Sequence, residues 1–227
     1  MVNAHQPIWI KFCGTTNLED AQASIDAGCN ALGFILCDSP RRLSPDAVGK
    51  ITSQLPEPIE KIGVFVNEEL NALVAIAEEC GLTGVQLQGD ESANYLMDVR
   101  SKLSVLRITK TLHADHVGEA DIFCASCHFA LDNLLIDNGT YQQRGGTGKV
   151  FDWTVASETL RGFKLPIAVV IAGGLNPGNV GDAVKLFRPY GVDVCSGVES
   201  AQGKKDPVKL KAYVAAVRKA EAEIAST

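Results

Sequence analysis

The chain alternates strand-like and helix-like segments eight times, and this alternation restricts its fold more than any other feature of the sequence. Short apolar runs bounded by turn residues are typical of buried strands, and apolar residues at helical spacing follow most of these runs. Repeated units of one strand and one helix favour a parallel sheet covered by helices, and eight such units favour a closed barrel. We therefore predict an α/β protein in which residues 1–227 form a single (β/α)8 TIM barrel domain.

Turn and cap residues place the expected elements along the chain. Asn17 is predicted to cap the first helix, with Asp20 as its partner in a variant of the capping box. Ser44 is predicted to cap the second helix and Asn67 the third. The region 113–129 has poor periodicity, and only a partial helix is expected there. The expected strands are 8–13, 31–36, 61–66, 84–87, 105–109, 133–137, 167–172 and 191–195. The expected helices are 18–27, 45–55, 68–80, 92–103 and 207–225. A short helix is also expected after Trp153, and another that begins with Asn176 as its cap and Pro177 as its first residue.

The composition excludes several functional classes. The chain has 227 residues, of which 46% are apolar and 21% charged, and its formal net charge is -6 at pH 7. An acidic balance argues against a nucleic-acid-binding or anionic-membrane surface. No apolar run is long enough to span a membrane, and residues 1–7 lack the regions of a signal peptide. We expect a cytoplasmic monomer or homodimer that binds neither nucleic acid nor membrane.

Seven cysteines at irregular spacing, in a chain without an export signal, predict reduced thiols rather than a disulfide framework. The segment from Cys124 through Cys127 to His128 matches the C-x-x-C-H pattern of covalent haem attachment, which is short enough to occur by chance. No second ligand pair at zinc-finger spacing follows it. We therefore interpret these cysteines as part of a helix or loop packed on the core, and no metal or cofactor is expected.

The first expected strand ends on a cysteine that is a candidate functional residue. Strand alternation puts Lys11 and Cys13 on one face, and Ile10 and Phe12 on the other. In parallel barrels the chemistry takes place at the carboxyl ends of the strands, so a thiol there points into the enclosed site. The helix that Asn17 begins would favour a thiolate nearby. By itself, the position is also consistent with a small buried hydrophobic residue.

Glycines follow the last two expected strands. Gly173 and Gly174 come after the seventh strand, and Ser196 and Gly197 come after the eighth. Glycines leave backbone N–H groups unobstructed, and barrels commonly bind phosphate at these two strand ends. Tight turns would explain one such pair. Two pairs at these positions predict a phosphate-binding site, and hence a small phosphorylated ligand.

Nine motifs occur in order along the chain: Lys11–Gly14, Ala31–Phe34, Ser39–Arg42, Gly63–Asn67, Val85–Gly89, Leu134–Asp137, Gly145–Lys149 with Phe151–Trp153, Ala172–Pro177 and Val192–Glu199. Together they resemble those of the phosphoribosylanthranilate isomerase family. The resemblance implies an enzyme of tryptophan biosynthesis that needs no metal or cofactor. The implied reaction is the Amadori rearrangement of the phosphosugar N-(5-phosphoribosyl)anthranilate to 1-(2-carboxyphenylamino)-1-deoxyribulose 5-phosphate.

The resemblance also implies roles for individual residues. The reaction needs an acid that protonates the ring oxygen of the sugar and a base that removes a proton from the neighbouring carbon. These roles map to Asp137 and Cys13, so Asp137 is expected to keep a proton near neutral pH and Cys13 to lose one, helped by Lys11. Arg41 would bind the anthranilate carboxylate. The phosphate would be bound by Gly174, Asn176, Ser196 and Gly197, with Lys149 and Asp193 as weaker candidates.

One position departs from the family pattern, because Gln88 stands where the family usually has histidine. Glutamine forms hydrogen bonds but does not titrate, so we interpret it as a change that tunes the site without abolishing activity. Two alternatives stay open. A related phosphosugar isomerase of histidine biosynthesis would have an aspartate in place of Cys13 and a second phosphate site. A phosphosugar-binding barrel without catalysis would tolerate the loss of the histidine.

Overall fold

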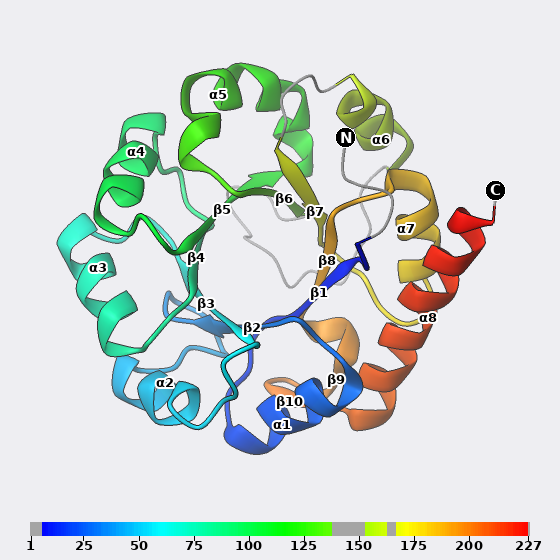
Figure 1. The fold of residues 1–227 in the computed structure, drawn as a ribbon, viewed down its shortest axis with the longest axis horizontal. Coiled ribbons are helices and arrows are strands. Elements are labelled where there is room, and N and C mark those ends of the chain that lie inside the picture. The colour runs from blue at the N-terminus through cyan, green and yellow to red at the C-terminus, as the bar shows by residue number, and fades with distance from the viewer. Residues whose placement is uncertain (1–5, 138–152, 163–166, 227) are drawn as a thin grey trace.

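The computed structural model describes residues 6–137, 153–162 and 167–226, and these form the predicted barrel (Figure 1). Eight parallel strands pair in chain order, and β8 closes the ring by pairing with β1 from Trp9↔Gly191 to Phe12↔Val194. The barrel strands are β1 (Trp9–Phe12), β2 (Ala31–Ile35), β3 (Glu60–Phe65), β4 (Gly84–Leu87), β5 (Arg107–His113), β6 (Asn133–Asp137), β7 (Ala168–Ile171) and β8 (Gly191–Val194).

Helices surround the strand ring (Figure 1). They are α1 (Leu18–Ala27), α2 (Pro45–Thr52), α3 (Leu70–Glu79), α4 (Ala93–Lys102), α5 (Ala120–Cys127), α6 (Trp153–Arg161), α7 (Val180–Phe187) and α8 (Pro207–Ala225), with 3-10 segments η1 (Ala114–Glu119), η2 (His128–Ala130) and η3 (Ser196–Val198). A hairpin of β9 (Glu199–Ala201) and β10 (Lys204–Lys205) follows η3. Neither α8 nor any other helix in the described ranges combines the length and the apolar character needed to cross a bilayer.

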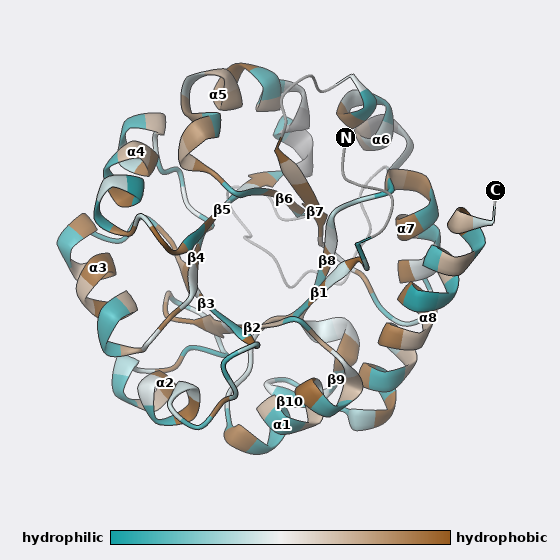
Figure 2. Cartoon of the chain, viewed as in Figure 1, coloured by the Kyte–Doolittle hydropathy of each residue, from teal (hydrophilic) through white to brown (hydrophobic). Residues whose placement is uncertain are grey.

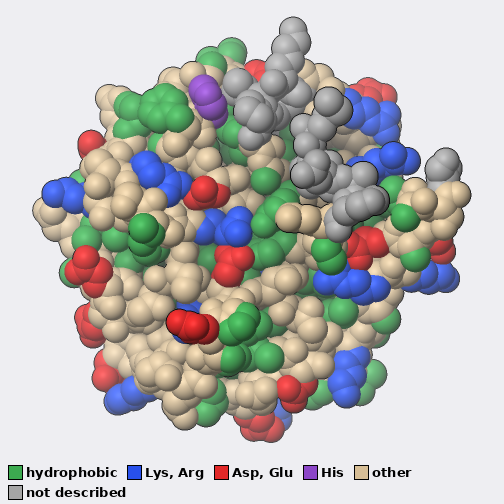
Figure 3. All heavy atoms as spheres, viewed as in Figure 1, with side chains coloured by type: hydrophobic (Ala, Val, Ile, Leu, Met, Phe, Trp, Pro, Cys, Tyr) green, Lys and Arg blue, Asp and Glu red, His purple; other side chains and the backbone are tan. Residues whose placement is uncertain are grey.

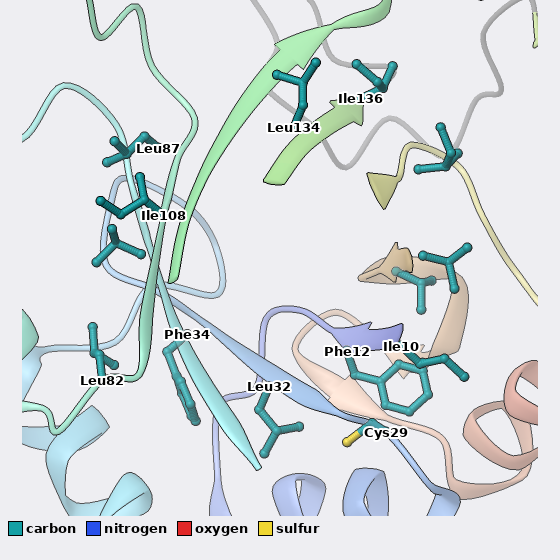
Figure 4. Close-up of a cluster of buried hydrophobic side chains, with 14 of the residues drawn as sticks. Ile10, Phe12, Cys29, Leu32, Phe34, Leu82, Leu87, Ile108, Leu134 and Ile136 are labelled. Atoms are coloured by element: carbon teal, nitrogen blue, oxygen red, sulfur yellow. The ribbon is translucent and has the colours of Figure 1, made fainter. Parts of the chain in front are cut away.

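The main hydrophobic core lies between the strands and the helices. Side chains that point outward from the strands, such as Ile10 and Phe12, are fully buried in it. Figure 4 shows these two side chains beside Cys29, and the ring of Phe12 meets that of Tyr213 in α8 edge to face, with 5.8 Å between centroids. Apolar positions on the helices alternate with hydrophilic ones (Figure 2). Acidic and basic side chains lie beside one another over the face in Figure 3.

The inside of the barrel contains a smaller apolar cluster and several buried polar side chains. The cluster comprises Trp9, Ala31, Ile62, Leu135, Val170 and Ala172. Lys11, Gln86 and Thr111 are among the polar residues that are buried in the same interior. Buried charges are normally paired or bind a ligand, because an isolated charge is costly to remove from water. These polar residues therefore mark the part of the barrel in which chemistry is expected.

The structure confirms the predicted helix caps at Asn17 and Ser44 and contradicts the one at Asn67. Asn17 Oδ1 accepts the N–H of Asp20 at 2.8 Å, as predicted. Asn67 does not cap α3, because its backbone is left-handed (φ 51°) and its side-chain oxygen accepts the N–H of Asp90 at 2.7 Å. Glu69 caps the helix instead, through its own carboxylate. The local sequence gives no indication that Asn67 bonds to a loop so far along the chain.

Helix α7 also begins later than the sequence predicts. Pro177 does not start the helix, which begins at Val180 after Asn179. The side chain of Asn176 instead accepts the N–H of Gly178 at 2.8 Å and closes a local turn. Asparagine favours such turns because its side chain imitates a backbone carbonyl. The turn separates the glycines after β7 from the start of the helix.

Candidate active site

Cys13 follows the last residue of β1 and points into the barrel, as strand alternation predicts. Its N–H donates to the carbonyl of Val194 at 2.9 Å, which extends the β1–β8 ladder beyond the strand. The residue is only 7% exposed. A Cβ atom on Gly33 of β2 would lie 2.8 Å from its sulfur. The absence of a side chain at Gly33 therefore leaves the space that the thiol occupies.

Two buried charges and a second thiol control the protonation of Cys13. Lys11, on the same face of β1, pairs with Asp193 of β8 at 2.9 Å. Burial lowers the pKa of the Lys11 ammonium, but Asp193 raises it, and the pKa ends above its ordinary value. The neighbouring thiol of Cys195 lowers the pKa of Cys13 from 9.0 to about 7, in spite of burial. The ammonium groups of Lys11 and Lys205 act in the same direction, so the thiolate of Cys13 forms more readily than that of an ordinary cysteine.

A second group of charges adjoins these strand ends and joins the predicted Arg41 to Glu199 and Lys205, which the sequence prediction missed. Arg41 donates through Nε and Nη2 to the two carboxylate oxygens of Glu199, each at 2.7 Å. Lys205 Nζ donates to the backbone carbonyl of Cys13 at 2.5 Å and contacts Glu199 at 3.4 Å. The same ammonium donates to the carbonyl of Cys195 at 3.2 Å. The predicted carboxylate-binding arginine thus already holds a carboxylate of its own chain, through two of its three guanidinium nitrogens.

Asp137, the candidate acid, is the last residue of β6 and is 8% exposed. Gln88 donates from Nε2 to Asp137 Oδ2 at 3.2 Å. Gln88 in turn accepts a hydrogen bond from Gln86 Nε2 at 2.8 Å. A chain of neutral amides therefore reaches the carboxyl group from β4. The residue that departs from the family pattern is a direct neighbour of the candidate acid.

His113 is a further interior residue that the sequence prediction missed. The sequence predicts that the fifth strand ends at Thr109, whereas β5 continues to His113. His113 is the register partner of Asp137, and register partners on adjacent strands point to the same face. Thr111 accepts a hydrogen bond from Gln86, so this face is the barrel interior. Polar residues at alternate positions from 109 to 113 are the sequence signal that could have revealed it.

A cavity at the carboxyl ends of β6, β7 and β8 joins the two candidate phosphate loops to the candidate acid. Backbone N–H groups in glycine-rich strand ends favour anions. Another residue of the lining, Cys195, donates from its thiol to Glu199 Oε1 at 3.9 Å and affects the pKa of Cys13. The lining residues that bear on the chemistry are Asp137, Gly174, Asp193, Cys195, Ser196 and Gly197.

The backbone explains why glycine occurs in these loops. Gly173 and Gly174 have left-handed conformations, with φ of 82° and 70°, that glycine adopts at little cost. A Cβ atom on Gly197 would lie 1.9 Å from the carbonyl oxygen of Leu175, so a larger residue does not fit. Asn176, a predicted phosphate residue, is not part of the cavity lining, because its side chain closes the turn after β7.

The opposite side of the rim carries another buried ion pair. Lys110 and Glu91 lie 3.0 Å apart, and both side chains are almost fully buried. Lys110 Nζ also donates to the carbonyl of Gly89 at 2.6 Å. The carboxylate of Glu91 accepts the N–H of Asn67 at 2.9 Å. This pair therefore connects the loops that follow β3 and β4 to strand β5.

A larger hollow, of about 340 Å³, lies at the other end of the barrel, beside the amino ends of β3, β4 and β5. Its two arginines are both paired with carboxylates. Arg100 contacts Asp132 at 2.5 Å, and Arg107 contacts Glu60 at 2.6 Å. Since these cations are neutralised by the chain itself, the hollow offers a poorer anion site than the glycine loops do.

Within residues 6–137, 153–162 and 167–226, no group of three or more His, Cys, Asp or Glu side chains is arranged to hold a metal ion. Cys124 and Cys127 are fully buried in α5, and burial raises the pKa of both thiols. Packing on the core therefore accounts for these two cysteines. Lys149, a weaker phosphate candidate, lies outside the described residues.

Curated relatives resemble the chain along nearly its whole length. Residues 10–216 match the family model for N-(5'phosphoribosyl)anthranilate (PRA) isomerase. The N-(5'-phosphoribosyl)anthranilate isomerase of Pelobacter propionicus is 38% identical over 217 residues, which cover 95% of this chain and 98% of the relative. The enzyme of the same name from Bacillus cereus is 40% identical over 205 residues, which cover 90% and 95%.

Solved structures agree with these relatives in fold. The phosphoribosyl anthranilate isomerase of Thermotoga maritima is 32% identical, with a TM-score of 0.79 and coverage of 93% of this chain and 99% of its own. A phosphoribosyl anthranilate isomerase in complex with reduced 1-(o-carboxyphenylamino)-1-deoxyribulose 5-phosphate is 30% identical, with a TM-score of 0.76 and the same coverage. The family resemblance of the nine motifs is thus confirmed, and the chain belongs to the N-(5'-phosphoribosyl)anthranilate isomerase family.

Proposed function

We propose that the chain catalyses the Amadori rearrangement of N-(5'-phosphoribosyl)anthranilate to 1-(2-carboxyphenylamino)-1-deoxyribulose 5-phosphate, a cytoplasmic step of tryptophan biosynthesis. Membership of the family supports the reaction. One observation of this chain carries the proposal further. A thiol with a pKa of about 7 and a nearly buried carboxyl group lie at the carboxyl ends of one barrel, beside a cavity with two glycine-rich loops.

In the proposed mechanism, Asp137 is the general acid and Cys13 is the general base. Asp137 gives its proton to the ring oxygen of the ribose, and the bond between that oxygen and C1 breaks to leave an iminium ion. The Cys13 thiolate then removes the proton from C2, and the electron pair of that bond moves to form an enolamine. Transfer of a proton from the C2 hydroxyl to C1 gives the ketone.

The surroundings of Cys13 support its role as a base. Lys11 and Lys205 stabilise negative charge on Cys13, and both ammonium groups are buried, where their effect is little screened by solvent. Asp137 is nearly buried, and Gln88 donates a hydrogen bond that orients its carboxyl group. An acid must be held in a defined position toward the atom that it protonates, which suits the role assigned to Asp137.

The anchors for the substrate follow from the same geometry. The phosphate would lie against the backbone of Gly174, Ser196 and Gly197, which line the cavity. Glu199 occupies Nε and Nη2 of Arg41, which leaves Nη1 to face the anthranilate carboxylate. Glu199 would then orient the arginine rather than compete for it. Asn176 would act indirectly, because it holds the turn that presents Gly174.

A turnover assay on purified full-length variants tests the two roles. We expect Cys13→Ser and Asp137→Asn each to abolish product formation, measured by chromatography, while product binding measured by calorimetry stays nearly intact. Cys29→Ser is the matched thiol control, because Cys29 is buried away from the cavity and burial raises its pKa to about 12. Turnover retained in both active-site variants would refute the mechanism.

Growth of a tryptophan auxotroph that lacks this isomerisation step tests the reaction itself. Expression of the wild-type chain should restore growth without tryptophan, and expression of Cys13→Ser should not. A chain that binds the product but restores no growth and shows no turnover would be a binding barrel, which is the outcome that contradicts the proposal.

A further inference from the structure

Cys13 and Cys195 follow two strands that are direct neighbours in the barrel. The register of β1 and β8 pairs Phe12 with Val194, and the N–H of Cys13 donates to the carbonyl of Val194 at 2.9 Å. Neighbouring strands lie about 4.8 Å apart, and register partners point to the same face. Disulfides usually join Cα atoms that are about 4.4–6.8 Å apart. The backbone therefore already holds the two cysteines within the range of a disulfide bond.

Contacts around the two side chains hold the cysteines side by side. The Cys195 thiol donates to Glu199 Oε1 at 3.9 Å, and the two thiols lie near enough that each shifts the pKa of the other. The ammonium of Lys205 donates to the backbone carbonyls of both residues, at 2.5 and 3.2 Å, and so fixes their spacing. A Cβ atom on Gly14 would lie 2.8 Å from the sulfur of Cys195, and one on Gly33 would lie 2.8 Å from that of Cys13. The two glycines therefore leave room for a pair of sulfur atoms.

The two thiols differ in the way that an attacking and a resolving cysteine differ. Cys195 and the nearby cations lower the pKa of Cys13 to about 7, whereas the neighbouring Cys13 and burial raise the pKa of Cys195. The thiolate is the form that reacts with oxidants, so Cys13 reacts first. Cys195 is half-buried and lines the cavity, and Cys13 lies next to it, so the cavity brings a small oxidant to the Cys195 end of this pair.

We propose that Cys13 and Cys195 form a reversible oxidation site that takes hydrogen peroxide and closes to a disulfide. The Cys13 thiolate attacks one peroxide oxygen, the O–O bond breaks, and the products are a sulfenic acid on Cys13 and, after proton uptake, one water molecule. The sulfur of Cys195 then attacks the sulfenic sulfur, and its proton leaves with the hydroxide as a second water molecule. Overall, two thiols are oxidised to one disulfide and one peroxide is reduced to two waters.

The disulfide would also control activity, a consequence that rests on the proposed function. A sulfur atom bonded to Cys195 no longer carries the charge that removes a proton from the substrate. Intracellular disulfides in most organisms are transient and serve catalysis or redox sensing, in keeping with such a site. Reduction by a dithiol would restore both the thiol pair and the base.

Other cysteines provide internal controls. Burial raises the pKa of Cys29, Cys80 and Cys124, so these thiols are poor reaction partners. Cys37 is the strongest competitor, because it is half-buried after β2 and the charge of Cys13 affects its pKa. Burial nevertheless raises the pKa of Cys37. Cys37→Ser is therefore the matched control for Cys195→Ser.

The test treats the full-length protein with hydrogen peroxide, blocks the remaining thiols with N-ethylmaleimide and locates disulfides by mass spectrometry with fragmentation. We expect a Cys13–Cys195 cross-linked peptide in the wild type and in Cys37→Ser, and its loss after dithiothreitol. In Cys195→Ser we expect no cross-link, and sulfinic acid on Cys13 that dithiothreitol does not reverse. A Cys13–Cys37 cross-link, or an oxidised wild type with separate oxo-acids on residues 13 and 195, would overturn the proposal.

Activity is measured in parallel and normalised to each untreated variant. Peroxide should abolish turnover in the wild type and in Cys37→Ser, and dithiothreitol should restore it. In Cys195→Ser the loss should be permanent. The cross-link is detected without any assay of turnover, so the two proposals can fail separately. If the protein forms the disulfide with peroxide but shows no turnover before treatment, the proposed function is refuted and the oxidation site stands.

Discussion

The two sides of the barrel rim both bury a lysine, but the two lysines have different effects. On the β1–β8 side, the ammonium of Lys205 contacts the backbone of Cys13 and lowers the pKa of its thiol. On the β4–β5 side, the ammonium of Lys110 is paired with Glu91 and donates to the loop after β4. The candidate acid, Asp137, accepts a hydrogen bond from Gln88 in that loop.

The comparison teaches that the neighbours of a buried cation decide what the cation does. Glu199 pairs with both Arg41 and Lys205, so its negative charge neutralises Lys205 only in part. The remaining positive charge of Lys205 can stabilise a nearby thiolate. A lysine with a carboxylate of its own mainly holds loops together. The buried lysines on the two sides of the rim therefore differ in function, because one affects a nearby thiol and the other mainly holds loops.

The largest expected effect separates structural from electrostatic roles of the two lysines. Lys110→Met should lower the free energy of unfolding by about 3–5 kcal/mol, because it leaves the buried carboxylate of Glu91 without its cation, whereas Lys205→Met should cost less because Glu199 keeps Arg41. Only Lys205→Met should also raise the pKa of Cys13. Urea unfolding gives the first quantity, and the pH dependence of Cys13 alkylation, followed by mass spectrometry, gives the second.

The exposed pair of Lys50 and Asp46 provides the matched control. Both side chains are more than two-thirds exposed, so Lys50→Met should change the unfolding free energy by less than about 1 kcal/mol. Equal shifts of Cys13 reactivity in Lys205→Met and Lys110→Met would show that the two sides of the rim are not electrostatically distinct.

The next effect concerns the ion pair beside the thiol, and its two halves should act in opposite directions. Lys11 lowers the pKa of Cys13, so Lys11→Met should raise it and move the acid limb of kcat/KM to higher pH by roughly one unit. Asp193 raises the pKa of Cys13, so Asp193→Asn should move the limb to lower pH. Shifts of the same sign in the two variants would mean that the pair acts through folding rather than through charge.

Local patterns predicted most of the fold and the glycine-rich part of the site. The alternation of strands and helices requires only neighbouring residues, and so does the cap at Asn17. The glycines at 173, 174 and 197 could be predicted as a group because parallel strands end at a common rim. Cys13 could be placed inside the barrel because strand alternation fixes its face.

Contacts between distant segments could not be predicted in the same way. Glu199 meets Arg41 across 158 positions of sequence, and Lys205 meets Cys13 across 192. Nothing near Arg41 indicates that its guanidinium is already paired. The end of β5 was missed for a related reason: the strand continues to His113 because β6 offers it a register partner, whereas the sequence after His113 has weak periodicity.

The smallest expected effect concerns the hydrogen bond between Gln88 and Asp137. Gln88→Leu keeps much of the side-chain volume but removes the donor to Asp137, a loss worth about 1 kcal/mol, or roughly fivefold in rate. If the amide orients the acid, the loss should appear in kcat with KM nearly unchanged. Gln88→His, which keeps a donor, should retain more of the rate than Gln88→Leu. A Gln88→Leu variant with wild-type kcat would show that the amide chain from β4 only fills space, and that the acid depends on other contacts, such as its register partner His113.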